Sequence, residues 1–531
     1  MERILKGSRI AEIDRRCIDE GIDSKMLMQN AGSSVARVVK NDLGNKKDLK
    51  GIVVCGGGNN GGDGFVAAID LIREGIDIKV FFTQPSERFS EDTAFYFSRL
   101  EDLKKENIFF LNIEDKKSEG SFTGQLKEAH FLIDAIFGTG IHGKDLYGQA
   151  RKLIEVINSI RPNKIYSVDI PSGVDSDNGK VLGIAIKADT TVTFGCKKLG
   201  LINQPGAYHA GRVKVADIGI PSRYFEQYEQ IFEPGMDWVA EKLPAREPWT
   251  YKHRVGKLLV VAGSVGLTGA ACMVCTSAMR AGAGLVTLVC PWELNNIFEQ
   301  KLTEVMTFPV NQTEDISIHY DSLEEILDLS KDFDALAVGP GISKNSGTIK
   351  LVRELLKRIE KPIVLDADGL AAIYGPREVN NDPDIDFSNV IITPHSGELA
   401  LILGMDTIKL EERYDINIRA SKEYNLVSVL KGPSTLISRP DGTTVINNTG
   451  DWALATAGTG DILTGIISSL ASQGMDNFHS AVCGTYIQGM ASDMVSLNTG
   501  KTSMVATDLL EGIKKVFLKL EKIKYKESRH G

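Results

Sequence analysis

The sequence predicts an α/β protein of two large domains, and three observations support this prediction. Its 531 residues exceed what one hydrophobic core usually organises. Short apolar runs alternate with amphipathic stretches in two separate series, which is the pattern of parallel strands joined by helices. Each series also contains a glycine-rich segment at the start of an expected helix. We therefore expect a first domain over residues 1–220, a linker over 221–248 and a second domain over 249–525.

The first series begins with an expected helix. Ser8 is suited to cap it, and Ile10, Ile13 and Cys17 share one of its faces. Further helices are expected at residues 65–73 and 92–105. Buried strands are expected at residues 51–55, 78–82, 131–134, 165–169 and 190–194. This order predicts a doubly wound parallel sheet.

The second series follows a segment that is rich in proline and acidic residues. Its strands are expected at residues 257–262, 285–290, 335–338, 362–366, 390–393 and 426–430. A hairpin is expected where the strands 434–438 and 443–447 flank the turn Arg439-Pro440-Asp441-Gly442. The chain is expected to end in helices at residues 462–472, 481–496 and 509–520.

Composition favours small-molecule chemistry. The net charge of -9 and the absence of basic blocks indicate no nucleic-acid partner and no anionic membrane surface. The charge-free stretch 258–279 is interrupted by glycines, so we interpret it as a strand, a loop and a helix rather than a membrane span. The seven cysteines have no regular spacing, and Cys272 and Cys275 are expected to pack in a core. The first residues lack the apolar core of a secretory signal, which favours the cytoplasm.

The first glycine-rich segment runs from Gly56 to Gly64 and contains Asn59, Asn60 and Asp63. Glycines allow backbone N–H groups to approach an anion closely, and asparagine amides can contact phosphate, ribose or a cation. Two further strand ends carry Asp134, Asp169 and Ser172. Because the carboxyl ends of parallel strands share one edge of a sheet, these side chains are expected to converge on a ligand, with oxygen atoms suited to a hard cation.

These motifs resemble the NAD(P)H-hydrate epimerase domain, a Rossmann-like fold, over about residues 1–220. The resemblance rests on the run Gly56–Gly64, on Asp134-Ala135-Ile136-Phe137-Gly138-Thr139-Gly140 and on Asp169-Ile170-Pro171-Ser172-Gly173. It implies a potassium ion held by Asn60, Asp134 and Ser172. It also implies substrate contacts from Asn59, Asn60, Gly61, Gly62, Asp63, Gly138, Thr139, Gly140, Ile141, His142, Gly143, Lys144 and Asp169. We expect Asp169 to be the proton-transfer group.

The second glycine-rich segment, Gly458-Thr459-Gly460-Asp461, opens an expected helix. Backbone N–H groups there suit an anion, and the carboxylate could act as the base that frees a hydroxyl for attack on a phosphate. Four other strand ends add polar loops: Gly339-Pro340-Gly341, Asp366-Ala367-Asp368-Gly369, Thr393-Pro394-His395 and Lys431-Gly432-Pro433-Ser434-Thr435. Lys431 supplies a cation for nucleotide phosphates.

This set resembles the ribokinase-like superfamily, and within it the ADP/ATP-dependent NAD(P)H-hydrate dehydratases, over about residues 235–520. The resemblance implies that Ala270, Gly341, His395 and Asp461 contact the hydrate, with Asp461 as the catalytic base. It implies that Lys431, Gly432, Pro433, Ser434, Thr435 and Gly460 contact an adenine nucleotide that carries Mg²⁺.

Together the two halves are expected to form a bifunctional repair enzyme for damaged NADH and NADPH. The first half would interconvert the R and S epimers of the hydrates NADHX and NADPHX, and the second would dehydrate the S form with ADP or ATP. The family also implies a homo-oligomer. Two alternatives stay open: a small-molecule kinase in the second half, and a first half that only binds nucleotides. The sequence does not distinguish ADP from ATP.

Overall fold

The computed structural model describes residues 1–527 apart from 45, 47, 142, 229, 247–248, 250–251 and 376–384. The chain divides into two compact units, one over Arg3–Glu229 and one over Gln230–Gly531 together with Met1–Glu2. Residues 230–246, which the sequence places in the linker, thus belong to the second unit. Among the described residues no helix is both long and apolar enough to cross a membrane.

The first unit contains a parallel sheet with the strand order β4-β3-β2-β5-β6-β7-β9. Its strands are β2 (Lys50–Cys55), β3 (Asp77–Phe82), β4 (Ile108–Phe110), β5 (Phe131–Ala135), β6 (Lys164–Val168), β7 (Thr190–Phe194) and β9 (Arg212–Ala216). The strand order reverses between β2 and β5, so the predicted doubly wound sheet is confirmed, and a switch point lies between these two strands. A short strand β1 (Glu2–Leu5) pairs in parallel with β8 (Lys197–Lys198).

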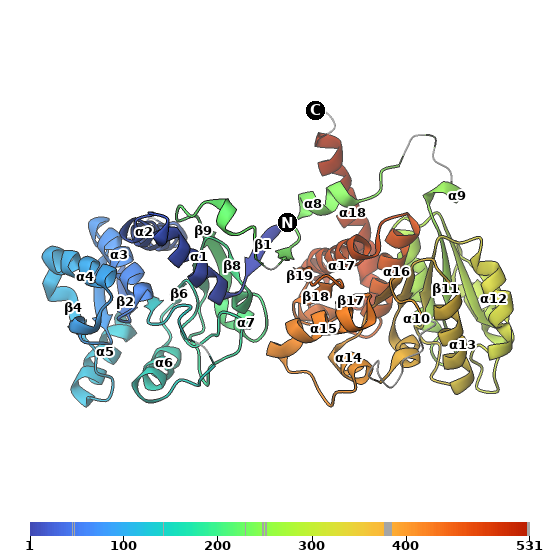
Figure 1. Ribbon diagram of the computed structural model, residues 1–531, viewed down its shortest axis with the longest axis horizontal. Coiled ribbons are helices and arrows are strands. Elements are labelled where there is room, and N and C mark those ends of the chain that lie inside the picture. The colour runs from blue at the N-terminus through green and yellow to red at the C-terminus, as the bar shows by residue number, and fades with distance from the viewer. Residues whose placement is uncertain are drawn as a thin grey trace. The chain divides into compact units, whose positions relative to one another are not determined.

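Helices cover both faces of this sheet (Figure 1). They are α1 (Gly7–Asp19), α2 (Ser24–Leu43), α3 (Asn59–Arg73), α4 (Glu91–Lys104), α5 (Lys116–Glu128), α6 (Gly148–Ile160) and α7 (Gly206–Ala210). One apolar core joins α2, α3 and α4 to the sheet, and a second joins α5 and α6 to its other face. The predicted cap of the first helix is wrong, because Lys6 is the N-cap and Ser8 lies inside α1.

The second unit is built on a larger sheet with the order β13-β12-β11-β14-β15-β16-β17-β18-β19-β10. Its strands are β10 (Ile231–Glu233), β11 (Lys257–Val261), β12 (Leu285–Pro291), β13 (Met306–Val310), β14 (Ala335–Val338), β15 (Ile363–Leu365), β16 (Val390–Ile392), β17 (Val427–Leu430), β18 (Thr435–Ser438) and β19 (Thr444–Asn447). The strands from β13 to β17 are parallel, and the predicted hairpin of β18 and β19 is antiparallel.

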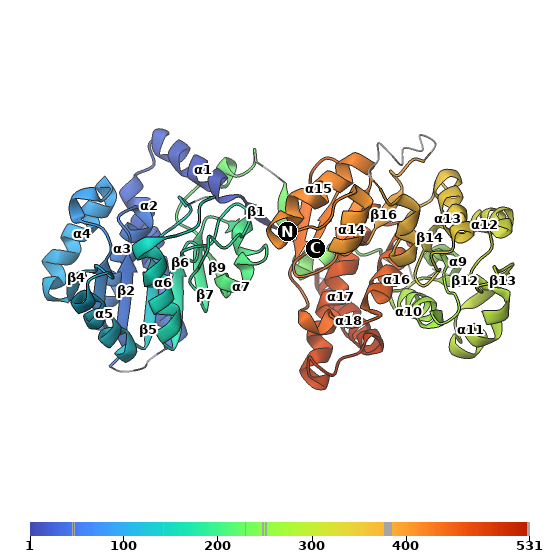
Figure 2. The ribbon, with the colours of Figure 1, turned by 90° about the horizontal axis from the view of Figure 1, so that it is seen from below.

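Helices again lie on both sides of the sheet (Figure 2). They are α8 (Met236–Lys242), α9 (Lys252–Val255), α10 (Thr268–Arg280), α11 (Asn295–Lys301), α12 (Leu323–Ser330), α13 (Ser346–Arg358), α14 (Ser396–Leu403), α15 (Arg413–Tyr424), α16 (Thr459–Ser472), α17 (Asn477–Thr499) and α18 (Leu509–Glu527). The stretch 258–279 forms β11, a loop and most of α10, as the sequence predicts. All seven cysteines are free thiols, and Cys275 lies in the core between α10 and the sheet.

Candidate active sites

The first glycine-rich segment lies at the switch point of the first sheet. The helix α3 begins at Asn59, earlier than expected, so Asn59 to Asp63 form its first turn. A Cβ atom on Gly61 would lie 2.0 Å from the Gly56 carbonyl oxygen, and one on Gly62 would lie 2.5 Å from the Met28 sulfur. These two glycines therefore allow close packing of the helix, because any larger residue would collide with its neighbours.

A cavity of about 660 Å³ opens beside this turn. Of the predicted substrate residues, the following line it: Asn59, Asn60, Asp63, Gly138, Thr139, Gly140, Ile141 and Asp169. Gly143 and Lys144 lie further along the loop and outside the lining, whereas His142 lies outside the described residues. Most of the predicted binding groups of the first unit thus open into one cavity.

Asp134 on β5 and Ser172 after β6 are hydrogen-bonded to each other, close to Phe137, which lines the cavity. The Ser172 hydroxyl donates to Oδ1 of Asp134 at 2.5 Å, and the Ser172 N–H donates to Oδ2 at 2.9 Å. Ser167 donates a further hydrogen bond to Oδ2 at 2.8 Å. Burial raises the pKa of Asp134 although these hydrogen bonds lower it. Asp134 is therefore a buried carboxylate whose charge is only partly compensated by hydroxyl and amide donors.

Asn60, in the first turn of α3, also lines the cavity. A Cβ atom on Gly138 would lie 3.2 Å from Oδ1 of Asn60, and the neighbouring Phe137 N–H donates to the Ser172 hydroxyl at 2.9 Å. The Asn60 side-chain nitrogen is buried without a hydrogen-bond partner in the described structure. A buried amide N–H group without a partner fits a site that holds a ligand with an acceptor atom.

Asp169 follows β6 and forms a buried ion pair that the sequence did not predict. Nζ of Lys198 donates to Oδ1 of Asp169 at 2.5 Å, and the Lys198 side chain is fully buried. Thr193 donates to the same oxygen at 3.0 Å and the Phe194 N–H at 3.3 Å. Asp169 also has a φ of +65°, a strained conformation that occurs often at functional sites.

Two more carboxyl groups face this ion pair. Asp63 from α3 and Asp14 from α1 line the same cavity. Burial, followed by the charges of Asp169 and Asp14, raises the pKa of Asp63 well above its usual value. Burial also raises the pKa of Asp14 to about 6, against the charge of Lys198. Perturbed carboxyl groups gathered in one cavity indicate a site for proton transfer.

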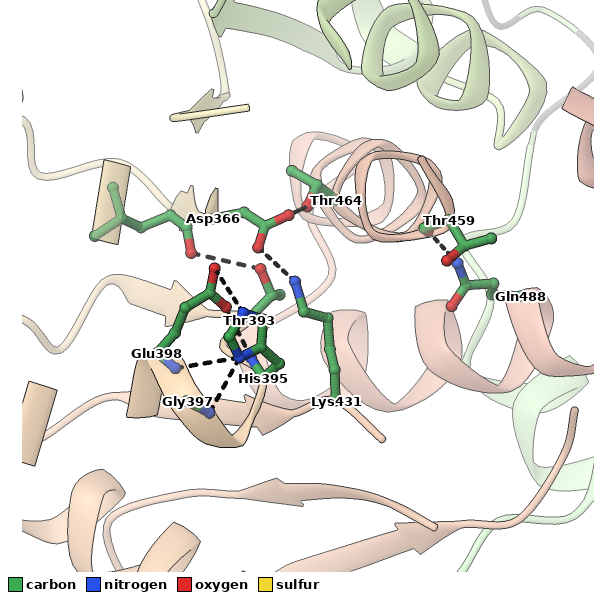
Figure 3. A network of polar contacts seen from close by, with 10 residues as sticks. Asp366, Thr393, His395, Gly397, Glu398, Lys431, Thr459, Thr464 and Gln488 are labelled. Atoms are coloured by element: carbon green, nitrogen blue, oxygen red, sulfur yellow. Dashed lines mark hydrogen bonds and ion pairs between the residues drawn. The ribbon is translucent and has the colours of Figure 1, made fainter. Parts of the chain in front are cut away.

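In the second unit, the predicted motifs lie at the carboxyl ends of neighbouring strands. Lys431 after β17 donates to Oδ1 of Asp366 after β15 at 2.8 Å, and Thr464 on α16 donates to Oδ2 at 2.6 Å (Figure 3). A Cβ atom on Gly460 would lie 3.4 Å from Nζ of Lys431. The predicted nucleotide residues Lys431 and Gly460 are therefore side by side at the N-terminus of α16.

Asp461 follows Gly460 in the first turn of this helix. Burial, followed by the negative charge of Asp366, raises the pKa of Asp461 to about 7, and Lys431 opposes this effect. Burial lowers the pKa of Lys431, but the charges of Asp366 and Glu398 outweigh it and the net shift is upward. The site thus combines a carboxyl group that titrates near neutral pH with a firmly charged lysine.

Hydrogen bonds from Arg413 fix the loop that follows β17. This buried guanidinium donates to the carbonyl oxygens of Leu430 and Lys431 at 3.2 Å and to that of Pro433. Burial lowers its pKa to about 10. Ser434 in the same loop has a φ of +55°. The conformation of this loop is therefore fixed by a residue that lies outside every motif in the sequence.

Besides Asp461, the predicted hydrate contacts are Ala270, Gly341 and His395. Gly341 lies against Ala270, since a Cβ atom on Gly341 would be 3.3 Å from the Ala270 Cβ. His395 is the N-cap of α14, and its Nδ1 accepts from the N–H groups of Gly397 and Glu398 at 3.1 and 3.2 Å (Figure 3). Nε2 is thus left to carry the proton of the neutral ring. His395 has a structural role as a cap, and its contact with the hydrate stays a prediction.

These features define a pair of α/β enzyme units, each with titratable groups at the carboxyl edge of a parallel sheet. The family model for the YjeF-related protein N-terminus matches residues 24–200, and the model for NAD(P)H-hydrate dehydratase matches residues 258–515. The helix α1 lies outside both matches.

Curated relatives align with this chain over nearly its whole length, across both matched regions. The bifunctional NAD(P)H-hydrate repair enzyme Nnr of Moorella thermoacetica is 37% identical over 98% of this chain and 97% of its own. The Nnr of Thermofilum pendens is 35% identical over 96% of each chain. The chain belongs to the family of bifunctional NAD(P)H-hydrate repair enzymes, which confirms the family that its motifs predict.

A solved structure resembles the second half. The ADP/ATP-dependent NAD(P)H-hydrate dehydratase of Bacillus subtilis, co-crystallised with ATP and Mg²⁺, is 26% identical and aligns with a TM-score of 0.46. The alignment covers 54% of this chain and 98% of that one.

Proposed function

We propose that the first unit interconverts the R and S epimers of NADHX and NADPHX, and that the second dehydrates the S form with ADP or ATP. The observation that carries the proposal is that one chain holds two separate clusters of carboxyl groups at the ends of parallel strands, one around Asp169 and one around Asp461. Two complementary reactions need two such sites, because a dehydratase that accepts one epimer leaves the other unrepaired.

In the first site, Asp169 is the proposed proton-transfer group. Within the described structure, every hydrogen bond to its carboxylate ends on Oδ1, which leaves Oδ2 as the available acceptor. Lys198 fixes the orientation of the carboxylate beside the cavity. Asn59, Asp63 and the loop 138–141 surround the remaining space and would bind the nucleotide. A positioned carboxylate of this kind typically contributes a factor of about 10²–10⁴ in rate.

The oxygen atoms beneath this cavity fit a potassium ion. Asp134, Ser172 and Asn60 would hold it through a buried carboxylate, a hydroxyl and the side-chain oxygen of Asn60, which lies near Gly138. When bound, the cation supplies positive charge close to the phosphate groups of the substrate. The buried charge of Asp134 would then be balanced, which the hydroxyl and amide donors alone do only in part.

In the second site, Asp461 is the proposed general base. It would take the proton of the hydrate hydroxyl, which then attacks the terminal phosphorus of the nucleotide. The N–H groups of Gly460 and Asp461 precede the first hydrogen bond of α16, which Ile462 donates to Gly458 at 3.1 Å, so they would stabilise the charge on the transferred group. Phosphate is a better leaving group than hydroxide. The lone pair of the ring nitrogen would expel it and form a C=N bond, and loss of a proton from the adjacent carbon to solvent would then form the C=C bond of the reduced nicotinamide ring.

The loop 431–435 is the proposed nucleotide site, with Lys431 beside the phosphates. Mg²⁺ bound to the nucleotide supplies further positive charge there. No group of three or more His, Cys, Asp or Glu side chains that could hold a metal occurs in the described part of the chain. The phosphates would therefore provide most of the magnesium ligands, as is usual for this ion. We also propose that the chain forms a homo-oligomer, as the resemblance to the family implies, and that it works in the cytoplasm.

Two substitutions test the assignment of the two sites. Asp169→Asn should abolish epimerisation and leave dehydration of the S form intact, and Asp461→Asn should do the reverse. Both replacements keep the size of the side chain, and calorimetric unfolding of each variant verifies that the mutated unit is folded. Loss of both activities in either variant would contradict the proposal. A phosphorylated product that accumulates without return of NADPH would favour a kinase.

A further inference from the structure

The first cavity contains a carboxyl group that neither the motifs nor the chemistry above uses. Asp14 on α1 lines the cavity together with Asp63, Asp169 and Lys198. Its Oδ1 atom is buried, and in the described structure it has no hydrogen-bond partner. A buried carboxylate oxygen without a partner is costly, so its presence in a cavity points to a ligand or a reacting group.

The position of Asp14 is fixed by the packing of its helix. The neighbouring Ile13 is completely buried, and Ile10 and Cys17 lie in the same apolar cluster beside Tyr224. At the start of α1 the Ser8 N–H donates to Asp177 at 2.7 Å. Asp14 is therefore presented to the cavity by a helix that is held at both ends, which is what a catalytic group requires.

The surroundings of Asp14 differ from those of Asp169. Asp169 is paired with the Lys198 ammonium group, whereas Asp14 has no cation in direct contact in the described structure. The titratable groups that act on Asp14 are Asp169 after β6 and Lys198 on β8, and Asp14 in turn acts on Asp63 of α3 and Cys17 of α1. The cavity thus offers one carboxylate held in an ion pair and a second carboxyl group that keeps its proton to a higher pH than an exposed aspartic acid does.

We propose that Asp14 is the general acid of the epimerase site and works opposite Asp169, an inference that rests on the proposed epimerase function. Asp14 would give its proton to the hydroxyl group of the hydrate. The C–O bond then breaks, its electron pair leaves with water, and the lone pair of the ring nitrogen forms a C=N bond.

A water molecule completes the inversion. It adds to the other face of the C=N bond, the π electrons return to nitrogen, and the proton lost by this water passes to Asp169. Each inversion moves one proton from Asp14 to Asp169, and the reverse reaction moves it back. The two groups therefore need opposite protonation states at the start of each inversion, as in other acid–base pairs that share a site.

The test uses the full chain with Asp14→Asn, Asp14→Glu and the control Glu12→Gln. Glu12 lies on the exposed side of α1 and pairs with Arg9, so its replacement removes the same charge from the same helix without reaching the cavity. Each chain is added to a mixture of NADPH-hydrate epimers with excess Asp169→Asn chain, which supplies dehydration. The slow phase of NADPH recovery then reports epimerisation, measured across a range of pH.

Asp14→Asn should lower kcat of the slow phase by about 10²–10⁴ and leave KM close to that of the wild type. The wild-type kcat/KM should fall as pH rises through about 6, where Asp14 loses its proton. This fall should be absent in Asp14→Asn, present in Asp14→Glu and unchanged in Glu12→Gln. If Asp14→Asn does not fold, the pH profile of Asp14→Glu tests the inference instead: the fall of kcat/KM with rising pH supports it, and a profile without this fall contradicts it.

Two results would overturn the inference while the epimerase function stands. One is an Asp14→Asn chain with wild-type kcat, and the other is a rise in KM alone, which would make Asp14 a binding residue. If the wild-type chain itself gives no slow phase above the rate without enzyme, the proposed function fails instead. Calorimetric unfolding of each variant chain verifies that its first unit is folded.

Discussion

Lys431 and Asp366 form an ion pair of 2.8 Å that ties the proposed nucleotide loop to the helix that carries Asp461. The Asp366 side chain is almost completely buried, and its second oxygen accepts from Thr464 on that helix. One lysine therefore serves two purposes: it balances a buried carboxylate, and it keeps its charge next to the place where phosphates are proposed to bind.

Replacement of Lys431 by methionine should weaken nucleotide binding. A hydrogen bond to a charged group is typically worth about 1.5–3 kcal/mol, which corresponds to a rise of about tenfold to a hundredfold in the nucleotide KM. The control is Lys422→Met, since Lys422 is exposed on the neighbouring helix α15. Steady-state dehydration measured over a range of nucleotide concentrations would detect the change, and equal nucleotide KM values in the two variants would refute the assigned role.

Dehydration should depend on the ionisation of Asp461. Because the carboxylate is the active form of a general base, kcat/KM should rise as pH increases through about 7, the pKa of Asp461 in the free enzyme. The charge of Asp366 contributes to this raised pKa, so Asp366→Asn should move the rise to lower pH. A rise that stays at the same pH in Asp366→Asn would contradict the electrostatic account of the site.

The Asp169–Lys198 pair should contribute to stability as well as to activity. Removal of one partner of a buried ion pair typically costs about 3–5 kcal/mol, because the other charge is left without compensation. Lys198→Met should therefore lower the unfolding temperature of the first unit in calorimetry of the full chain. The double variant with Asp169→Asn should recover much of this stability but no epimerase activity. Recovery of activity in the double variant would exclude Asp169 from the chemistry.

Epimerisation should require potassium. Exchange of K⁺ for the smaller Li⁺ should slow epimerisation, since Asp134, Ser172 and Asn60 would no longer all reach the ion. Dehydration of the pure S form should keep its rate, because no part of the second unit is proposed to hold K⁺. Ser172→Ala should remove most of the dependence on K⁺. Potassium dependence that persists unchanged in Ser172→Ala would place the ion elsewhere.

The sequence predicted the elements that have strong local signals. The two parallel sheets, the hairpin of β18 and β19 and the helix that carries Asp461 follow from apolar periodicity and from turn residues. The strands β1, β4, β8, β9, β10 and β13 were missed, and all of them are short or lie at a sheet edge. β4 has only three residues and lies at the edge of the first sheet. β13 lies at the edge of the second and is only partly buried, so its apolar pattern is weak.

The residues missed in the sites have no local signal at all. Lys198 follows another lysine, so the sequence predicts an exposed side chain. In the structure this side chain is fully buried against Asp169. Asp14 lies on an amphipathic helix that is far in sequence from the other cavity residues. Arg413 sits about twenty positions before the loop that it supports. Such residues become visible only when tertiary packing brings them to a site, although a charge next to the apolar face of a helix, as in Asp14, is a hint.

The most direct test of two complementary activities in one chain is the recovery of NADPH from a mixture of both hydrate epimers. The wild-type enzyme would be supplied with K⁺, Mg²⁺ and either ADP or ATP, while the absorbance of the reduced nicotinamide ring is followed. Complete recovery with stoichiometric use of one nucleotide is the predicted result, and it would identify the phosphate donor. Recovery that stops when the S epimer is consumed would contradict the epimerase assignment, and no recovery with either nucleotide would contradict the account of the second site.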